Sequence, residues 1–261
     1  MYEVFYGGSN KVHPEGFMMS RPKGAGHYVI LLIRSGGEYN IDGNIQMVPP
    51  GSAVILDPKV SYSYSNPKGQ YIDDWLHFSF EGDNIILSRK LPLNTFFSLS
   101  DIEDPATLLR QILFELSYTK DEEVQKDNIN CLMNVLINHL LSAYKMQGDE
   151  RYQNPYYPHF QAIRLSMLSG RLYDISMQKV ADSMSMSVSY FQHLYKEFFG
   201  ISYQKDVIQM RIEYAKRLVK STDNKLEHIA SLCGYTNEIH FYRQFKKITG
   251  MTPGQYRQLN N

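Results

Sequence analysis

Cysteine and long apolar runs are scarce in this chain. Only two cysteines occur among 261 residues, Cys131 and Cys233, and each falls in an apolar stretch of a predicted helix. We therefore expect no disulfide framework and a reducing, cytoplasmic compartment. No apolar run approaches about 18 residues, and residues 1–20 lack a signal-peptide core, so we expect neither membrane insertion nor secretion.

Patterns that mark catalytic and metal sites are also missing. The chain has no glycine-rich phosphate loop, no nucleophile elbow, no His-x-His pair and no Cys/His set at metal-ligand spacing. The sequence therefore predicts no catalytic residue, no bound metal and no cofactor. An enzyme is the weaker class of function.

Net charge is zero, but the charge is unevenly distributed. Residues 156–261 hold 14 basic and 8 acidic side chains, whereas residues 1–155 hold 13 basic and 19 acidic ones. A basic half joined to an acidic half is typical of a DNA-binding domain attached to a domain that does not bind DNA.

One sequence pattern occurs twice in the basic half, at residues 180–202 and 229–252. The offset is 49 residues from Val180 to Ile229 and 50 from Phe191 to Phe241. Both copies share an alanine near the start, an aromatic apolar stripe and a glycine near the end. Two ordinary helical hairpins would be the simpler interpretation. The matched positions instead favour two helix-turn-helix units.

Each copy separates an apolar stripe from a polar face. The predicted core stripes are Phe191, Leu194, Tyr195 and Phe198 in the first copy, and Phe241, Phe245 and Ile248 in the second. Ser187 is a suitable N-cap for the first of these helices. The candidate DNA-binding residues lie on the opposite faces: Ser189, Tyr190, Gln192, His193, Lys196, Glu238, His240, Tyr242, Arg243 and Lys246.

Residues 158–259 resemble the AraC/XylS family of bacterial transcription regulators. The resemblance is carried by the run FYRQFKK at residues 241–247 and by TGMTPGQYR at 249–257. It implies seven helices, with both helix-turn-helix units on one long helix at residues 203–220. The linking helix has an apolar stripe, Ile208, Ile212, Ala215 and Val219. Such a connector lets both recognition helices enter successive major grooves, roughly 34 Å apart.

The acidic half is a different kind of sequence. Short β-prone runs at residues 28–33, 38–41, 45–48, 53–56, 62–64 and 75–80 are separated by Gly and Pro, which indicates a sandwich or barrel. Residues 20–82 resemble the cupin-like effector domain of AraC-type regulators. Metal-dependent cupins carry clustered histidines, but His27 and His77 are isolated in this sequence, so an organic ligand is favoured over a metal.

Four residues are candidates for binding that ligand. Arg21, Tyr64, Asp73 and Trp75, the only tryptophan, fall at positions resembling sugar-contacting ones in arabinose-type members. An indole face for stacking and polar partners for hydroxyls suit a sugar. In the alternative interpretation, Trp75 packs in the core and Arg21 forms a surface ion pair.

Two helical stretches follow, at residues 105–118 and 129–144, each with a wide apolar stripe. They either cover the barrel or form a dimer contact, as helices placed here do in the resembling family. We favour the dimer contact, because two wide stripes exceed what one small barrel face needs. The polar, proline-containing stretch that follows suits a linker.

The sequence therefore predicts an α+β protein of two domains. Residues 1–147 form a cupin-like β-barrel with dimerisation helices, 148–157 a linker, and 158–261 an all-α double helix-turn-helix domain. The predicted function is sequence-specific transcription regulation under a small polar effector such as a sugar. Predicted partners are double-stranded DNA, that effector, a second copy of the chain and RNA polymerase, with no membrane. Two alternatives remain: a cupin-type metal-dependent sugar isomerase or dioxygenase, and a regulator whose barrel is an empty scaffold.

Overall fold

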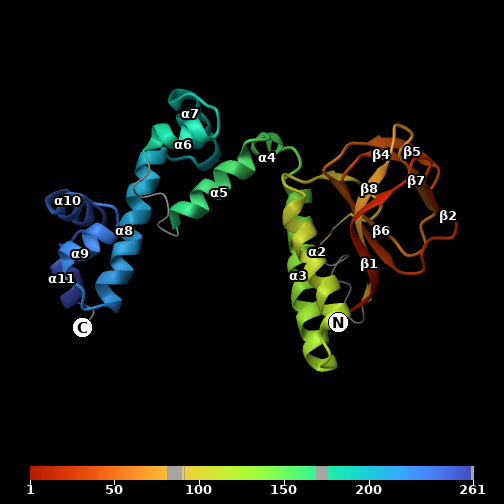
Figure 1. The fold of residues 1–261 in the computed structure, drawn as a ribbon, viewed down its shortest axis with the longest axis horizontal. Coiled ribbons are helices and arrows are strands. Elements are labelled where there is room, and N and C mark those ends of the chain that lie inside the picture. The colour runs from red at the N-terminus through yellow and green to blue at the C-terminus, as the bar shows by residue number, and fades with distance from the viewer. Residues whose placement is uncertain (81–89, 91, 169–175, 260–261) are drawn as a thin grey trace. The chain divides into compact units, whose positions relative to one another are not determined.

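The computed structural model describes the whole chain except residues 81–89, 91, 169–175 and 260–261. It divides into two compact units, Met1–Gln153 and Asn154–Asn261 (Figure 1). The division falls inside the predicted linker 148–157, where a four-residue helix, α4 (Glu150–Gln153), forms. None of the helices in the described ranges is long and apolar enough to cross a membrane.

The N-terminal unit contains two antiparallel sheets. The five-stranded sheet has the order β1 (Tyr2–His13), β8 (Tyr71–Phe80), β3 (Tyr28–Ile33), β6 (Ser52–Leu56) and β9 (Phe97–Ser98). The four-stranded sheet has the order β2 (Met18–Arg21), β7 (Tyr62–Ser65), β4 (Gly37–Ile41) and β5 (Asn44–Val48). Within the described residues no ladder joins the two sheets, so the expected closed cupin-like barrel is not confirmed.

The two sheets pack face to face, and successive side chains of each strand point to opposite faces of its sheet. Val29, Leu31 and Ile33 of β3 join Tyr39 of β4 and Tyr64 of β7 in one buried cluster between the sheets. The intervening residues of β3 face the other way. Burial on both faces explains why the sequence of β3 is apolar throughout.

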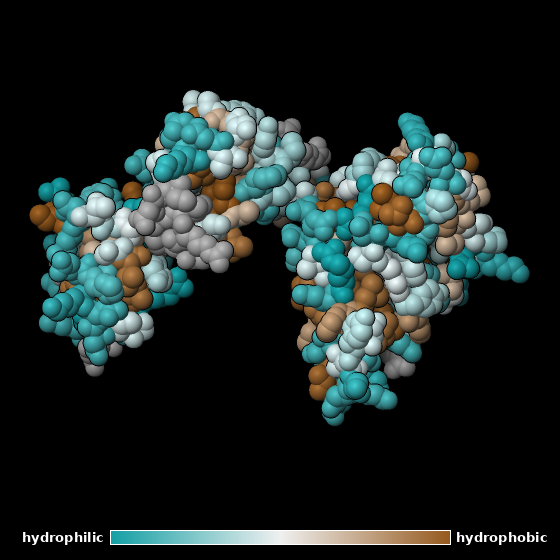
Figure 2. All heavy atoms as spheres, in the orientation of Figure 1, coloured by the Kyte–Doolittle hydropathy of each residue, from teal (hydrophilic) through white to brown (hydrophobic). Residues whose placement is uncertain are grey.

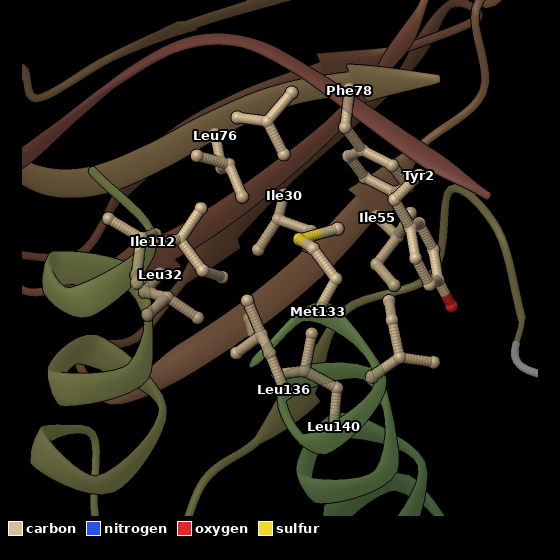
Figure 3. Close-up of a cluster of buried hydrophobic side chains, with 14 of the residues drawn as sticks. Tyr2, Ile30, Leu32, Ile55, Leu76, Phe78, Ile112, Met133, Leu136 and Leu140 are labelled. Atoms are coloured by element: carbon tan, nitrogen blue, oxygen red, sulfur yellow. The ribbon is translucent and has the colours of Figure 1, made fainter. Parts of the chain in front are cut away.

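The outer face of the five-stranded sheet is covered by α2 (Glu103–Tyr118) and α3 (Glu122–Lys145). Figure 3 shows Met133, Leu136 and Leu140 of α3 pointing at Ile30 and Leu76 of the sheet. Leu136 is fully buried within the single chain. The expectation that the apolar stripe at 129–144 forms a dimer contact is therefore wrong, since this stripe completes the core of its own unit.

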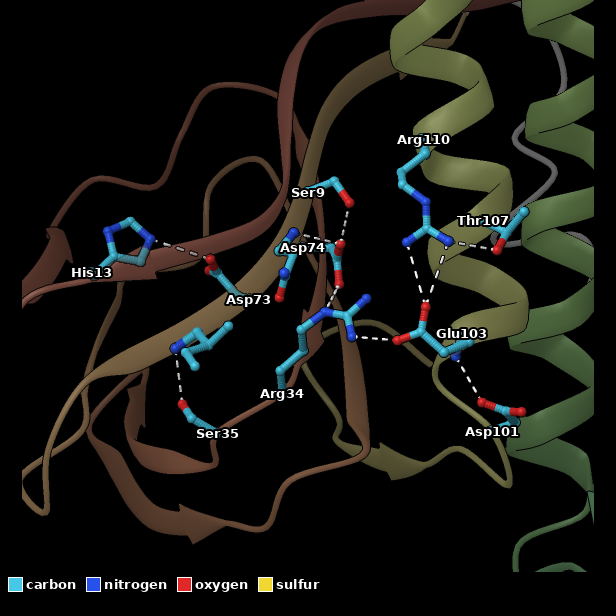
Figure 4. Close-up of polar contacts among 12 residues, drawn as sticks. Ser9, His13, Arg34, Ser35, Asp73, Asp74, Asp101, Glu103, Thr107 and Arg110 are labelled. Carbon is cyan, nitrogen blue, oxygen red and sulfur yellow. Dashed lines mark hydrogen bonds and ion pairs between the residues drawn. The ribbon is translucent and has the colours of Figure 1, made fainter.

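A buried polar group connects the sheet to α2. Asp74 accepts hydrogen bonds from Ser9 Oγ at 2.6 Å and from the backbone N–H of Asn10 at 2.8 Å (Figure 4). Arg34 Nε donates to Asp74 at 2.5 Å, and Arg34 Nη1 donates to Glu103 at 2.5 Å. The buried carboxylate is thereby paired and hydrogen-bonded, which offsets its desolvation.

The C-terminal unit is helical. Its described part contains seven helices: α5 (Tyr157–Leu168), α6 (Met177–Ser183), α7 (Val188–Phe199), α8 (Tyr203–Ser221), α9 (Leu226–Leu232), α10 (Glu238–Thr249) and α11 (Pro253–Gln258). Ser187 caps α7 by accepting from the N–H of Tyr190. Gly200 and Gly250 end α7 and α10 with φ of 70° and 79°, a left-handed conformation that favours glycine.

Candidate nucleic-acid interface and ligand site

Two helix-turn-helix units, α6–α7 and α9–α10, lie in the C-terminal unit. The core stripe predicted for α7 is confirmed, because Phe191, Leu194, Tyr195 and Phe198 are all buried. In α10, Phe241 and Phe245 are fully buried, but Ile248 is 39% exposed. The assignment of Ile248 to the core is therefore wrong. It lies in the last turn of α10, beyond the part that packs inward.

The linking helix α8 runs from Tyr203 to Ser221, close to the predicted 203–220. Ile212, Ala215 and Val219 are buried as predicted, and they pack with the second helix-turn-helix unit. Ile208 is only half-buried and lines a surface pocket. One helix thus forms part of the core of the second unit and contacts α7 of the first.

The candidate DNA-binding residues lie mainly at the surface. Exposed side chains are Ser189, Tyr190, Gln192, His193 and Lys196 on α7, and Glu238, His240, Arg243 and Lys246 on α10. Tyr242 is half-buried, and burial together with the nearby Glu238 carboxylate raises its pKa. Exposed donors and cations on both helices can hydrogen-bond to base edges or neutralise phosphates.

A buried ionic contact orients the first helix-turn-helix unit on α8. Asp206 of α8 accepts from Tyr195 Oη at 2.7 Å and from Arg164 Nε of α5 at 2.8 Å. Arg164 also stacks over Phe199 at 4.8 Å. Sequence reasoning missed this trio, because Arg164 and Asp206 are far apart in the chain and neither belongs to a repeated motif.

The four candidate ligand-binding residues belong to strands around the inter-sheet space. Tyr64 and Asp73 are buried, Trp75 is half-buried and Arg21 is exposed at the end of β2. Tyr64 and Trp75 belong to the inter-sheet cluster. The charges of Asp73 and Arg21 both act on the pKa of Tyr64, the first raising it and the second lowering it, although burial raises it most. Tyr64 and Trp75 thus share the inter-sheet cluster, and Asp73 and Arg21 lie near enough to act on Tyr64 electrostatically.

Asp73 is a buried carboxyl group with unusual electrostatics. Burial, together with the neighbouring Asp74, raises its pKa to about 7, against a smaller opposing effect of Tyr71. His13 Nε2 lies 3.2 Å from Asp73 Oδ1, whereas Oδ2 has no hydrogen-bond partner among the described residues. An oxygen in this state can accept a hydrogen bond from a ligand hydroxyl.

Several aromatic neighbours of Asp73 were missed in the sequence. Tyr39 and Tyr71 share a hydrogen bond between their hydroxyls at 2.5 Å, and Phe17 stacks on His13 with ring centroids 3.9 Å apart. One local signal was available, because Tyr71 and His77 continue the alternation of Asp73 and Trp75 along β8. His13 and Tyr39 reach the region around Asp73 through the pairing of β1 and β4 in the sheets, and Phe17 follows His13 in the turn between β1 and β2.

His27 and His77 are not isolated, contrary to the sequence-based expectation. His27 Nε2 lies 2.6 Å from His77 Nδ1, and Tyr6 Oη lies 3.4 Å from the same His27 nitrogen. Burial, followed by the effects of His27 and Arg21, lowers the pKa of His77 to about 4. In the described part of the chain, no three His, Cys, Asp or Glu side chains group as a metal site would require.

The sequence is similar to known transcription regulators. A helix-turn-helix domain family matches residues 180–259. The probable transcriptional regulator LumQ of Photobacterium leiognathi is 22% identical over 240 residues, with 88% of each chain covered. The arabinose operon regulatory protein of Salmonella typhimurium is 22% identical over 254 residues, with 92% of this chain and 87% of that protein covered. A shorter match, 27% over 86 residues, covers 33% of this chain and 28% of the melibiose operon regulatory protein of Escherichia coli K12.

Proposed function

Because this chain belongs to the AraC-type transcription regulators, we propose that α7 and α10 are its two DNA-reading helices and that the N-terminal unit controls them. The observation that carries this proposal is the pair of helix-turn-helix units attached to one helix, α8, with polar residues exposed on both second helices. Ser189, Gln192, His193, Glu238, Tyr242 and Arg243 face base edges, and the lysines contact phosphates.

The proposed effector is a small polar molecule, a sugar, bound in the cupin-like N-terminal unit. Trp75 provides a stacking face, while Arg21, Tyr64 and Asp73 hydrogen-bond to ring hydroxyls. The names of the arabinose and melibiose operon regulators support this ligand class. The unit acts as a sensor and not as an enzyme, and the regulator affects transcription through RNA polymerase.

The regulator acts as a homodimer, through the outward side of the α2–α3 pair. Phe114 and Tyr118 of α2 are 59% and 70% exposed, with ring centroids 5.1 Å apart, and Val135 of α3 is 42% exposed. Figure 2 shows hydrophobic side chains reaching the surface in this helical region. Exposed apolar residues on a helix pair are suited to an interface between proteins.

Genomic footprinting of the protein, with and without candidate sugars, tests the proposed function. We expect paired operator sites whose occupancy or spacing changes with one sugar, next to genes that use that sugar. Bound sites that do not change with any sugar would contradict the effector assignment. Absence of sequence-specific sites would contradict the function as a whole.

A further inference from the structure

A pocket of about 310 Å³ opens on α8 between the two helix-turn-helix units. One wall is Met177 of α6, whose sulfur lies 3.2 Å from the side-chain nitrogen of Gln192 on α7. The opposite wall contains His240 and Gln244 of α10. The pocket therefore borders both helices that are proposed to read DNA, although sequence analysis predicted no site on the helix that links them.

Hydrogen-bond donors surround this pocket. Tyr203 and Arg211 line it from α8, and none of the lining residues is Asp or Glu. The Tyr203 hydroxyl is buried and has no hydrogen-bond partner in the part of the chain that the structure describes. An unpaired buried hydroxyl costs free energy, which a bound acceptor would recover.

Tyr235 orients two donors of the pocket, the guanidinium of Arg211 and the side-chain amide of Gln244. The guanidinium of Arg211 lies 5.4 Å from the centre of the Tyr235 ring, and the Tyr235 hydroxyl donates to Gln244 Oε1 at 3.0 Å. Because the amide oxygen of Gln244 is engaged, its nitrogen lies on the side of His240, 3.0 Å from Nε2. A positioned guanidinium beside neutral donors is suited to binding an anionic oxygen.

We propose that this pocket binds a backbone phosphate of the DNA segment that joins the two major grooves, an inference that rests on the proposed DNA-binding function. Arg211 neutralises the phosphate and the Tyr203 hydroxyl donates a hydrogen bond to it. The apolar side chains of Val207 and Ile208, which also line the pocket, contact the adjoining deoxyribose. Such a contact carries no base information and sets the register of both recognition helices on the duplex.

Binding of the full chain to a mixed-sequence duplex of about 40 base pairs tests this contact, measured over a range of salt concentrations. Arg211→Gln should reduce the slope of log K against log salt concentration by about 0.9, the value for one phosphate contact. It should weaken binding by the same factor on duplexes of any sequence. Tyr203→Phe removes only an uncharged donor, so it should weaken binding about tenfold and leave the slope unchanged.

Arg217→Gln is the matched control, because it removes the same charge from α8 at an exposed position outside the pocket. Its slope should stay close to that of the original chain. Circular dichroism would show whether Arg211→Gln unfolds the protein. In that case the DNA affinity of Tyr203→Phe, which keeps the aromatic ring, tests the proposal. Unchanged affinity and slope in both pocket variants would overturn the proposal.

Inorganic phosphate distinguishes the two sources of the ligand. One outcome is that phosphate raises the melting temperature of the original chain but not that of Arg211→Gln, while both proteins bind DNA with the same salt slope. This result would show that the pocket binds free phosphate, and it would refute the DNA contact. Failure of the original chain to bind any duplex would instead contradict the proposed function.

Discussion

Asp73 shows how one residue can couple burial to pH. Its carboxyl group has a pKa of about 7 in the folded chain, against 3.8 for the free side chain. Between these values the folded chain keeps a proton that the unfolded chain has lost. Stability therefore falls as pH rises through this window and levels off above it.

Asp73→Asn should remove this pH dependence. Relative to the original chain, the variant should gain stability as pH rises from about 4 to 7, on the order of 1 kcal/mol per pH unit. Urea unfolding of both proteins at several pH values measures the difference. His77, whose pKa is lowered to about 4, titrates in both proteins and so cancels in the comparison. Parallel stability curves would show that Asp73 is ionised throughout.

Arg243 is the residue of α10 for which base reading makes the sharpest prediction. Its side chain is exposed, as a bidentate contact to guanine requires. Arg243→Ala should cost about 1–3 kcal/mol of binding free energy and relax the preference at a single base pair. Competition between operator duplexes with single base-pair changes measures this. Equal weakening on every duplex would make Arg243 a phosphate contact.

At the scale of elements, α3 separates two roles by its two sides. One side, with Met133, Leu136 and Leu140, packs on the sheet and is fully buried. The other side carries the partly exposed Val135. Neighbouring positions of one helix therefore report on different properties, the stability of the N-terminal unit and its assembly.

Leu136→Glu should unfold the N-terminal unit, because an unpaired carboxylate within the core costs several kcal/mol. Val135→Glu should leave the unit folded and convert the proposed dimer to a monomer. Circular dichroism reports folding and analytical ultracentrifugation reports mass. A folded monomer of Leu136→Glu would mean that the stripe is an interface after all. A Val135→Glu protein that stays dimeric would move the interface elsewhere.

At the scale of the whole molecule, regulation requires that ligand binding in one unit bias DNA binding by the other. A ligand can do so only if it binds two arrangements of the protein with different affinity. In the proposed regulator, the chain around α4, where the two units meet in sequence, is their covalent connection.

Trp75→Ala and Arg21→Ala should each abolish the response to the sugar and leave DNA binding intact. With the native sugar at about 100 times its dissociation constant, the original chain should gain roughly 2.7 kcal/mol of stability, and the variants should gain none. Thermal unfolding and gel-shift assays measure the two effects. If both variants respond with unchanged affinity, the ligand binds elsewhere.

Helical features were largely predictable from the sequence. Caps such as Ser187 and glycine ends such as Gly200 act within a few residues, and the stripe of α7 repeats with the period of the helix. The strands with alternating or continuous apolar residues were equally visible. Strand β1 could not be recognised in the sequence, because its glycines and the left-handed Asn10 interrupt the apolar pattern. Its pairing with β8 also shifts register at two places.

The sequence by itself determined the two helix-turn-helix units and the β-rich character of the first half, because these depend on residues that are close together along the chain. It also determined the uneven charge, which is a matter of composition. Only the tertiary structure decided that the α3 stripe covers the sheet, that His27 meets His77, and that the α8 pocket lies between two helix-turn-helix units. Each of these depends on which distant segments pack together. Sequence periodicity shows that a face will be buried, but the partner that buries it is a property of the folded chain.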